Sequence, residues 1–394
     1  MTALDFLLTV AALPFLAASS YLAALAVLAR RQLPPAAVEA RLRFDIVVPA
    51  HNEEAEIAQT VASLLAIEYP RSHYRVLVVA DNCSDATAER AAAAGARVLV
   101  RKDTERRGKG YALAYAFDRS RADKLADVVV VVDADTLVSP NLLSAFAARF
   151  SAGASVVQAD YGVRNPHASW RTRLMTIALA AFHGVRSVAR ERLGLSCGLR
   201  GNGMGFTTTV LEQHPPQAFS IVEDLEYGIH LGYAGVRVEY VHEARVLGHM
   251  AVSEGASRTQ RRRWERGRQA LVRAHVPALL RQAVQRRSAL LLDLALDLIV
   301  PPIGQLALFS GLGLLAAIAA LPFGAIVSPI IWGIALAGIL LHVLAGWHSS
   351  GVGPRGLVDL LWAPVYILWK LTLRFGDRGK TPQEWVRTKR EVHS

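Results

Sequence analysis

Hydrophobic residues are distributed unevenly along the chain. Residues 4–29 and 289–373 are rich in apolar side chains, whereas the stretch between them alternates short apolar runs with polar turns. An apolar segment of about 20 residues is long enough to cross a bilayer as a helix. We therefore predict four segments: an N-terminal transmembrane anchor (1–31), a cytoplasmic globular domain with amphipathic interface helices (32–287), transmembrane and interfacial helices (288–373) and a basic cytoplasmic tail (374–394).

The first apolar segment is followed, rather than preceded, by the positive pair Arg30 and Arg31. A cleaved signal peptide carries its positive charge before the apolar stretch. A spanning anchor is therefore the preferred interpretation, and a signal peptide is the alternative. Positive residues flanking a span remain on the cytoplasmic side, which places this pair and the globular domain inside.

The same rule places the basic tail, residues 370–390, on the cytoplasmic side. An even number of crossings must then separate the globular domain from the tail. Spans near 300–320 and 325–347 satisfy this requirement, with residues 357–371 in the membrane interface. The predicted location is the inner membrane, with several crossings.

In the middle domain, strand-like apolar runs alternate with helical patterns, which favours a doubly wound, mostly parallel α/β sheet. The strongest run is Val128–Asp135, where five valines lead into two aspartates. An uninterrupted β-branched run of this kind is typical of a buried central strand. Further strands are predicted at 44–50, 74–80, 97–100 and 154–158, and helices at 55–67, 87–94, 111–119 and 140–150. Asn52 is the predicted cap of the first of these helices.

The second half of this domain contains basic amphipathic segments. Residues 168–190 place aromatic and aliphatic side chains on one helical face and arginines on the other. This pattern is typical of a helix lying at a membrane interface, and a core-packed surface helix is the alternative. Another helix is predicted at 221–234, short edge strands at 236–240 and 244–246, and a second basic amphipathic region at 258–285.

Carboxylates follow two of the predicted strands. Asp81 ends the second strand, and Asp133 and Asp135 follow the valine run. Parallel strands bring these ends to one edge of the sheet, where open α/β folds bind ligands. Asp81 is a candidate contact for a nucleoside, and Asp133 and Asp135 are candidate ligands for Mg²⁺ or Mn²⁺ bridging two phosphates. Solvated turn-forming aspartates are the alternative.

Cationic and aromatic side chains complete this chemistry. Lys109 lies between two glycines, so a flexible loop can bring its ammonium to a phosphate. Gln260, Arg263 and Trp264 fall within about one helical turn. They combine an amide, a guanidinium for a leaving diphosphate and an aromatic face for a sugar or base. A basic helix facing lipid head groups is the alternative.

Glu223 and Asp224 open a predicted helix after a short apolar pair. In a group transfer that inverts the configuration of the attacked carbon, one carboxylate must take the proton of the attacking hydroxyl. Asp224 is the candidate for this base. Capping of the helix is the structural alternative, because carboxylates stabilise helix N-termini.

The chain carries a net charge of +11. Its arginines cluster beside the apolar segments and in 258–287, so anionic lipid head groups and a nucleotide diphosphate are expected partners rather than nucleic acid. Cys83 and Cys197 provide neither a disulfide framework nor a zinc spacing.

Five motifs occur in an order that resembles the membrane-integrated family 2 glycosyltransferases, the group of cellulose, chitin and hyaluronan synthases. They are Pro49-Ala50-His51-Asn52-Glu53, Asp81-Asn82-Cys83-Ser84-Asp85, Asp133-Ala134-Asp135, Glu223-Asp224 and Gln260-Arg261-Arg262-Arg263-Trp264.

The resemblance implies a GT-A fold, a nucleotide-sugar donor that is usually a UDP-sugar, Mg²⁺ or Mn²⁺, and inversion to a β-linkage. By position, Asp224 with Glu223 is the catalytic pair and Asp135 with Asp133 is the metal pair. The implied donor-binding residues are Pro49, Ala50, Asn52, Glu53, Asp81, Lys109, Asp133, Gln260, Arg263 and Trp264.

We expect an enzyme that transfers sugars to a growing envelope or extracellular polysaccharide. Its expected partners are the nucleotide-sugar donor, a glycan or lipid-linked acceptor and membrane lipids. Export or accessory subunits are further candidate partners. Single transfer to a lipid-linked acceptor is the nearest alternative. A non-catalytic, nucleotide-binding membrane subunit is the alternative from another class.

Overall fold

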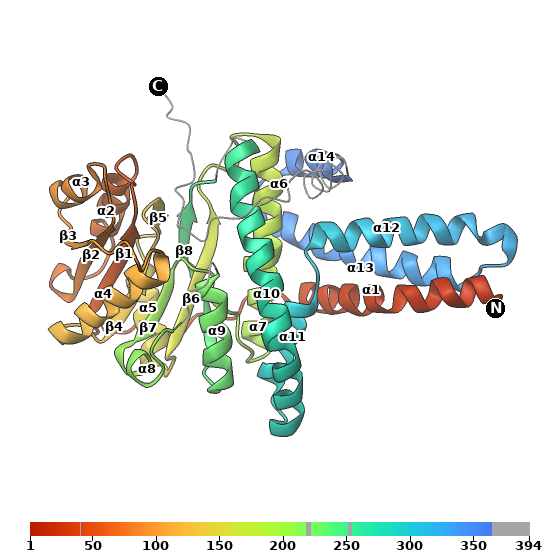
Figure 1. Ribbon diagram of the computed structural model, residues 1–394, viewed down its shortest axis with the longest axis horizontal. Helices are drawn as coiled ribbons and strands as arrows, with labels where there is room; N and C mark the ends of the chain where they lie inside the picture. Colours follow the sequence, from red (N-terminus) through yellow and green to blue (C-terminus); the bar gives the residue numbers. More distant parts are fainter. Residues whose placement is uncertain (40, 218–221, 251–253, 365–394) are drawn as a thin grey trace. The chain divides into compact units, whose positions relative to one another are not determined.

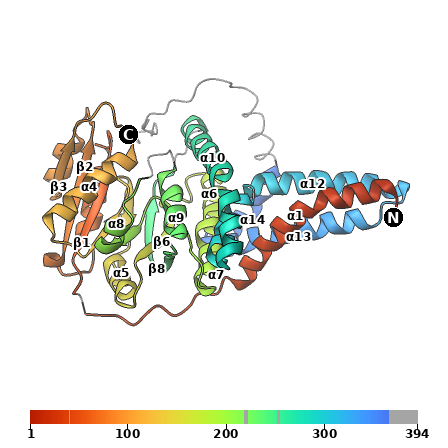
Figure 2. The ribbon, with the colours of Figure 1, turned by 60° about the horizontal axis from the view of Figure 1, so that its bottom comes forward.

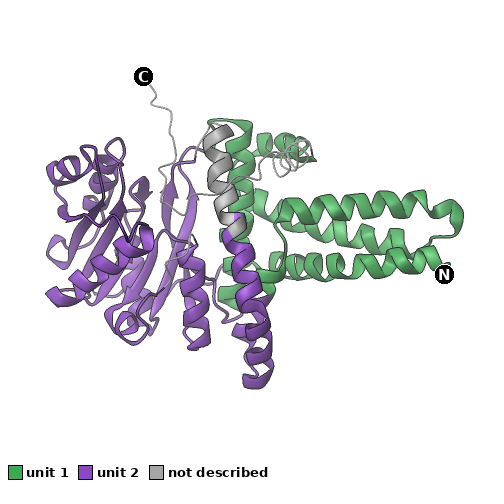
Figure 3. Cartoon of the chain, viewed as in Figure 1, with its two compact units in different colours: residues 1–30, 166–192, 296–381 green, residues 31–165, 193–295, 382–394 purple. Residues whose placement is uncertain are grey.

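The computed structural model describes residues 1–39, 41–217, 222–250 and 254–364, without the side chains of 254–264 and 266. The chain forms two compact units (Figure 3). Unit 1 comprises Met1–Arg30, Pro166–Arg192 and Leu296–Thr381, and unit 2 comprises Arg31–Asn165, Leu193–Ala295 and Pro382–Ser394.

Unit 2 is built on an eight-stranded sheet with the order β3-β2-β1-β4-β7-β6-β8-β5 (Figure 1). Strands β3, β2, β1 and β4 are parallel, whereas β7 is antiparallel to both of its neighbours. The strands are β1 (Phe44–Ala50), β2 (Tyr74–Asp81), β3 (Arg97–Arg101), β4 (Val128–Val131), β5 (Thr136–Val138), β6 (Val156–Val163), β7 (Met204–Thr207) and β8 (Val238–Gly248).

The helices of unit 2 connect these strands and follow them. They are α2 (Ile57–Leu65), η1 (Arg71–His73), α3 (Thr87–Ala93), α4 (Lys109–Asp123), α5 (Leu142–Ser151), α8 (Thr208–Gln213), α9 (Glu223–Tyr233) and α10 (Glu254–Arg286). Helix α11 (Ala289–Ile299) continues from unit 2 into unit 1.

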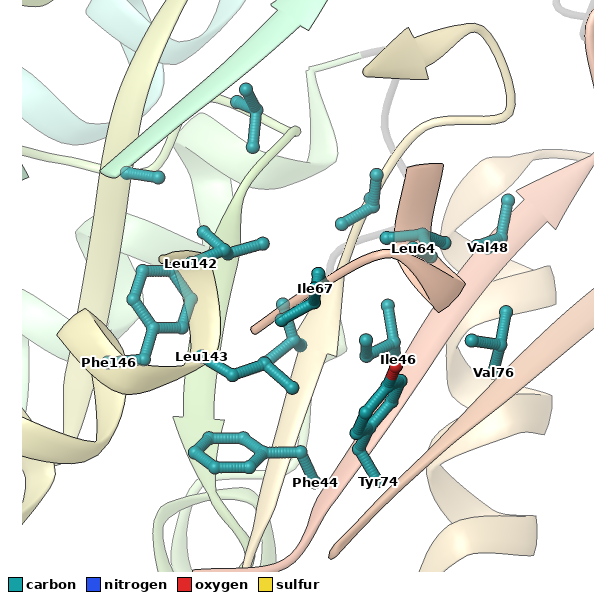
Figure 4. Close-up of a cluster of buried hydrophobic side chains, with 14 of the residues drawn as sticks. Phe44, Ile46, Val48, Leu64, Ile67, Tyr74, Val76, Leu142, Leu143 and Phe146 are labelled. Carbon is teal, nitrogen blue, oxygen red and sulfur yellow. The ribbon is translucent and has the colours of Figure 1, made fainter. Parts of the chain in front are cut away.

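Helices cover both faces of the sheet, which explains the unbroken valine run. On one face, Ile46 and Val130 pack in a core with Leu64 of α2 and with Leu142 and Phe146 of α5 (Figure 4). The other face carries α4 and α9 (Figures 1 and 2), where the ring of Phe206 lies 6.2 Å from Phe117 and 5.7 Å from Tyr227. Because alternate residues face opposite layers, every residue of β4 must be apolar.

The predicted mostly parallel α/β fold is confirmed, with two local corrections. The two short edge strands predicted at 236–240 and 244–246 form one strand, β8, which lies between β6 and β5 with a register shift opposite Ala159 and Asp160. Asn52, predicted as a helix cap, instead adopts a left-handed conformation (φ 56°) before the first turn of α2, whose N-cap is Glu56.

Within the described residues, unit 1 is built of helices. They are α1 (Ala3–Leu28), α6 (Trp170–Leu179), η2 (Ala180–Val185), α7 (Arg186–Arg192), α12 (Ile303–Ala319), η3 (Leu321–Phe323), α13 (Val327–Ser350) and α14 (Pro354–Leu360). Helices α1, α12 and α13 lie side by side (Figures 1 and 2), and Leu22, Leu306 and Ile339 form one of their shared clusters. The Asp5 carboxylate accepts hydrogen bonds from the backbone of Val327 and Ser328 and so caps α13.

Among the described residues, two helices are long and apolar enough to cross a membrane, namely α1 and α13. Helices α11 and α12 pass the same test only as a pair bent by 67°, which makes three spans if the pair is counted as one. The span predicted near 300–320 therefore corresponds to a 17-residue helix with a sharp bend before it. The predicted interfacial segment 357–371 is described only as far as residue 364, and the basic tail, 374–394, lies outside the described residues.

The amphipathic segment predicted at 168–190 is helical, with a π-helical turn, η2, between α6 and α7. The prediction of an outward arginine face is wrong for Arg186 and Arg190. Both are buried, with Arg190 only 1% exposed, and both pair with Asp297 at nitrogen–oxygen distances of 3.2 and 2.7 Å. Helical periodicity could not reveal this pairing because Asp297 lies more than 100 residues further along the chain.

Candidate active site

The carboxyl ends of β1, β2 and β4 lie at the same edge of the sheet. Ala50 pairs with Ala80, and Val47 pairs with Val131, so the ends of the three parallel strands are nearly level. The strand geometry therefore brings the aspartates that follow β4 to the edge where β2 ends in Asp81. This is the position at which open α/β sheets bind their ligands.

Side chains after β1 and β2 form one half of this edge. The Asn52 side-chain oxygen accepts a hydrogen bond from the Ser84 backbone at 2.8 Å. The Glu53 backbone donates to Thr87 Oγ1, also at 2.8 Å. These contacts link the loop that follows Pro49 and Ala50, the last residues of β1, to the loop after β2 and the start of α3, so these segments support each other.

Asp81 is buried, with 1% of its side chain exposed, and is paired with Arg101 of β3 at 2.6 Å. A buried carboxylate needs such a partner to remain charged. Asp81 is therefore held rigidly at the end of β2, and its predicted contact with a nucleoside remains a prediction.

Lys109 connects the side chains in the other half of this edge of the sheet. Its ammonium donates to Asp133 Oδ1 at 2.6 Å and to the Gly201 carbonyl at 2.7 Å, and it lies 4.0 Å from Glu223 Oε1. Burial disfavours the ammonium form, but Asp133, Glu223 and Asp224 outweigh it and raise the pKa of Lys109. Three predicted site residues from distant parts of the chain thus converge on one cation.

The loop before β7 brings backbone into this cluster. Gly201 has a φ of +78°, and a Cβ added there would lie 3.0 Å from Asp224 Oδ2 and 3.5 Å from Lys109 Nζ. Only glycine fits this position without strain. The adjacent Asn202 is fully buried, and its side chain accepts from the Asp133 backbone and donates to Thr136.

Gln158 of β6 anchors the same loop. Its amide nitrogen donates to the Asn202 carbonyl at 2.7 Å, and its oxygen accepts from the Arg200 backbone at 2.9 Å. The sequence analysis selected neither Gln158 nor Asn202 as a site residue. A lone glutamine in an apolar run, here Val-Val-Gln-Ala, was the available signal, because buried amides require partners.

An apolar pocket explains the unusual acid–base properties of the two carboxylates that open α9. Glu223 and Asp224 border a pocket lined by Leu113, Leu199 and Phe206. Burial, opposed by Lys109, raises the pKa of Glu223 to about 7. Burial also raises the pKa of Asp224, again against the effect of Lys109. One of these carboxyls is therefore able to hold or release a proton near neutral pH.

Glu223→Gln is expected to flatten the pH dependence of the thermal unfolding midpoint, measured in EDTA between about pH 5 and pH 8. The folded-state pKa of Glu223, about 7, lies above its ordinary value of 4.5, so the folded protein retains a proton that the unfolded chain releases. This contribution to stability is present below pH 4.5 and is lost as the pH rises through 7. Exposed Glu212→Gln should keep the wild-type slope, and an unchanged slope in Glu223→Gln would contradict the assignment.

The donor set at Asp133 and Asp135 fits a divalent cation that prefers oxygen ligands. Both side chains are partly exposed beyond the buried end of β4. Burial and then the charges of Asp133 and Asp135 raise the pKa of the neighbouring Tyr161. Among the described side chains, the four carboxylates Asp133, Asp135, Glu223 and Asp224 thus outnumber the nearby cations Lys109 and Arg200. Mg²⁺ and Mn²⁺ use one or two carboxylates and complete their shell with phosphate and water.

The predicted residues Gln260, Arg263 and Trp264 lie in the first half of α10. Their side chains are outside the described residues, so their position relative to the carboxylates stays a prediction. The structure brings together Lys109, Asp133, Glu223 and Asp224, and holds Asn52, Glu53 and Asp81 at the neighbouring strand ends.

Comparisons with known proteins agree with this architecture. Residues 41–267 match the family model described as "Glycosyltransferase like family 2". Hyaluronan synthase of Streptococcus pyogenes is 32% identical over 160 residues, which is 38% of this chain and 36% of the synthase. A probable glycosyltransferase of Bacillus subtilis, YdaM, is 24% identical over 241 residues, 58% of this chain and 56% of YdaM. The matches thus span about a third to a half of these relatives.

A solved structure shares the fold over most of the chain. The mannosyltransferase PcManGT from Pyrobaculum calidifontis, in complex with GDP-Man and Mn²⁺, has a TM-score of 0.57 and 19% identity. The similarity covers 93% of this chain and 98% of that protein. At this level of identity the similarity establishes the fold.

Proposed function

The chain belongs to glycosyltransferase-like family 2 and is a glycosyltransferase, and on this premise we propose that it transfers sugar from a nucleotide-sugar donor, with inversion, to a growing polysaccharide. The observation that carries this proposal is the convergence of Lys109, Asp133 and the Glu223–Asp224 pair at the carboxyl edge of the sheet. Such a cluster offers a base beside groups that can hold a diphosphate. Similarity to a hyaluronan synthase supports a polymerising enzyme.

In the proposed reaction, the acceptor hydroxyl attacks the anomeric carbon from the face opposite the diphosphate. The new carbon–oxygen bond forms as the bond to the diphosphate breaks, and the proton of the hydroxyl passes to the Asp224 carboxylate. A base is most effective when its pKa approaches the working pH. Burial in the apolar pocket raises the pKa of Asp224 in this direction.

Asp133 and Asp135 are the residues proposed to hold Mg²⁺ or Mn²⁺, which would neutralise the diphosphate charge as the leaving group departs. Lys109 already lies against Asp133 and would share the same phosphate oxygens. Asp81, with Asn52, Glu53 and the backbone of Pro49 and Ala50, is proposed to line the nucleoside side. Gln260, Arg263 and Trp264 are proposed to close the donor and acceptor site.

Membranes containing the chain should incorporate label from one member of a panel of radiolabelled UDP- and GDP-sugars. A ladder or high-mass product is expected, because a polymerase keeps extending its own product. The measurement is gel and size-exclusion analysis of the product with and without Mn²⁺. Asp118→Asn, which removes an exposed carboxylate from α4, should give the same product as the wild type.

Two other outcomes would contradict this proposal. A single lipid-soluble product would indicate transfer of one sugar to a lipid-linked acceptor. Nucleotide binding without transfer or hydrolysis of any donor would indicate a non-catalytic nucleotide-binding subunit. The membrane location is part of the proposal and rests on the two apolar helices α1 and α13.

A further inference from the structure

Helices α9 and α10 lie side by side within unit 2 (Figure 1). A Cβ added to Gly267 of α10 would lie 2.8 Å from Val222, immediately before α9. Near the far end of α9, the Arg286 guanidinium donates to the Tyr233 carbonyl at 2.9 Å. The two helices therefore contact each other at both ends of α9.

Three metal-ligating side chains meet at this helix pair. Glu226 and His230 are four residues apart on α9 and so share one face, and His275 comes from α10. One ligand atom from each lies within 4.8 Å of the others. We propose that Glu226, His230 and His275 form a binding site for a transition-metal ion of the Zn²⁺ class that joins α9 to α10.

The geometry suits a small tetrahedral ion. Ligand bonds of about 2.0–2.1 Å place tetrahedral ligand atoms about 3.4 Å apart, so the three side chains need to close by little more than 1 Å. The ring of His230 is exposed and free to make this adjustment. Two imidazoles and one carboxylate leave a fourth position for water, as in many zinc sites.

Two further observations point to a ligand at this place. Glu226 Oε2 is buried and has no hydrogen-bond partner among the described residues, which is costly for a carboxylate oxygen. The Tyr233 hydroxyl lies 3.5 Å from His275 Nδ1, and a polar outer partner of this kind commonly orients a metal-binding imidazole.

This site differs from the Asp133–Asp135 pair in chemistry and in effect. Imidazole nitrogen favours Zn²⁺, whereas an all-oxygen pair favours Mg²⁺ or Mn²⁺. Glu226 follows Asp224 by two residues on α9, so a metal here would hold the helix that carries the proposed base against α10. The inference rests on this geometry alone and does not require the proposed reaction.

The test uses the full chain, purified in detergent through an affinity tag that contains no histidine. Bound metal is removed with EDTA, and the protein is then kept in a buffer that contains Mg²⁺. Zn²⁺ affinity is measured by competition with a chromophoric chelator in an Asp135→Asn background, and Co²⁺ is used to record a visible absorption spectrum. One equivalent of Zn²⁺ is expected, with Co²⁺ bands typical of a four- or five-coordinate site. At about 100-fold excess over Kd, Zn²⁺ should raise the unfolding midpoint by about 5 °C.

Because loss of an outer partner alone costs about 10–100-fold in affinity, His275→Gln and Glu226→Gln are expected to weaken binding at least about 100-fold. His230→Ala changes an exposed ring and provides the second test if a buried variant does not fold. Exposed His167→Ala should bind like the wild type. Equal Zn²⁺ affinity in wild type and His230→Ala, or no stoichiometric binding by wild type, would overturn the proposal.

Discussion

Asp224→Asn is expected to lower the rate of sugar transfer by about 10²–10⁴-fold, the usual contribution of a general base, while donor affinity changes little. Asparagine has nearly the same shape but cannot accept the proton of the attacking hydroxyl. The surrounding contacts favour retention of the fold, because Gly201 already leaves room for this side chain. The measurement is the initial rate of transfer at saturating donor, together with nucleotide binding by the same preparation.

Two matched variants make this result specific. Asp118→Asn removes an exposed carboxylate from α4 and should keep wild-type activity. Glu223→Gln should retain more activity than Asp224→Asn if Asp224 is the base. If Asp224→Asn remains fully active, Asp224 is not the base, and the reverse order of the two variants would move that role to Glu223.

Asp135→Asn is expected to reduce transfer by about 10³-fold or more, because a bound divalent cation provides several kcal/mol of stabilisation to the departing diphosphate. Asp135 follows β4 beside Asp133, and loss of one carboxylate leaves a single strong oxygen ligand at this edge. A Mn²⁺ titration of activity should shift to much higher concentrations in the variant.

Binding provides an independent readout for this second prediction. The affinity of the wild-type chain for nucleoside diphosphate should rise on addition of Mn²⁺, and this increase should be lost in Asp135→Asn. A variant that keeps both its Mn²⁺ response and its activity would remove Asp135 from the metal site. Asp118→Asn again serves as the matched carboxylate control.

Local sequence patterns predicted much of the parallel half of the sheet. β4 is apolar at every position, and β1 and β2 are apolar apart from Asp45, Arg75 and Asp81, because helices cover both faces of the sheet. This pattern is visible without a structure. β7 was not predicted, because its four residues lie in a glycine-rich stretch and become a strand only by pairing with β4 and β6. Its register with β4 places Gly201 and Asn202 beside Asp133.

Some charged side chains of the site were predictable from the sequence, whereas the partners of others were known only from the structure. Asp133 was identifiable because it directly follows an apolar run, and Asp224 was identifiable because it lies at the start of a predicted helix. The burial of Arg190 and the pairing of Asp81 with Arg101 could not be inferred, since their partners lie on other elements. Helical or strand periodicity describes the faces of one element and contains no information about which element will cover them.

The sequence by itself thus determined the succession of strands and helices from β1 to β4, the central valine strand and the carboxylates at its end, because these depend on neighbouring residues. Only the tertiary structure decided that Lys109 reaches the Gly201 carbonyl, 92 residues away, and that His275 lies beside Glu226 and His230. Such contacts depend on how the helices pack on the sheet and on the closure of long loops. Both are properties of the whole chain rather than of any short segment.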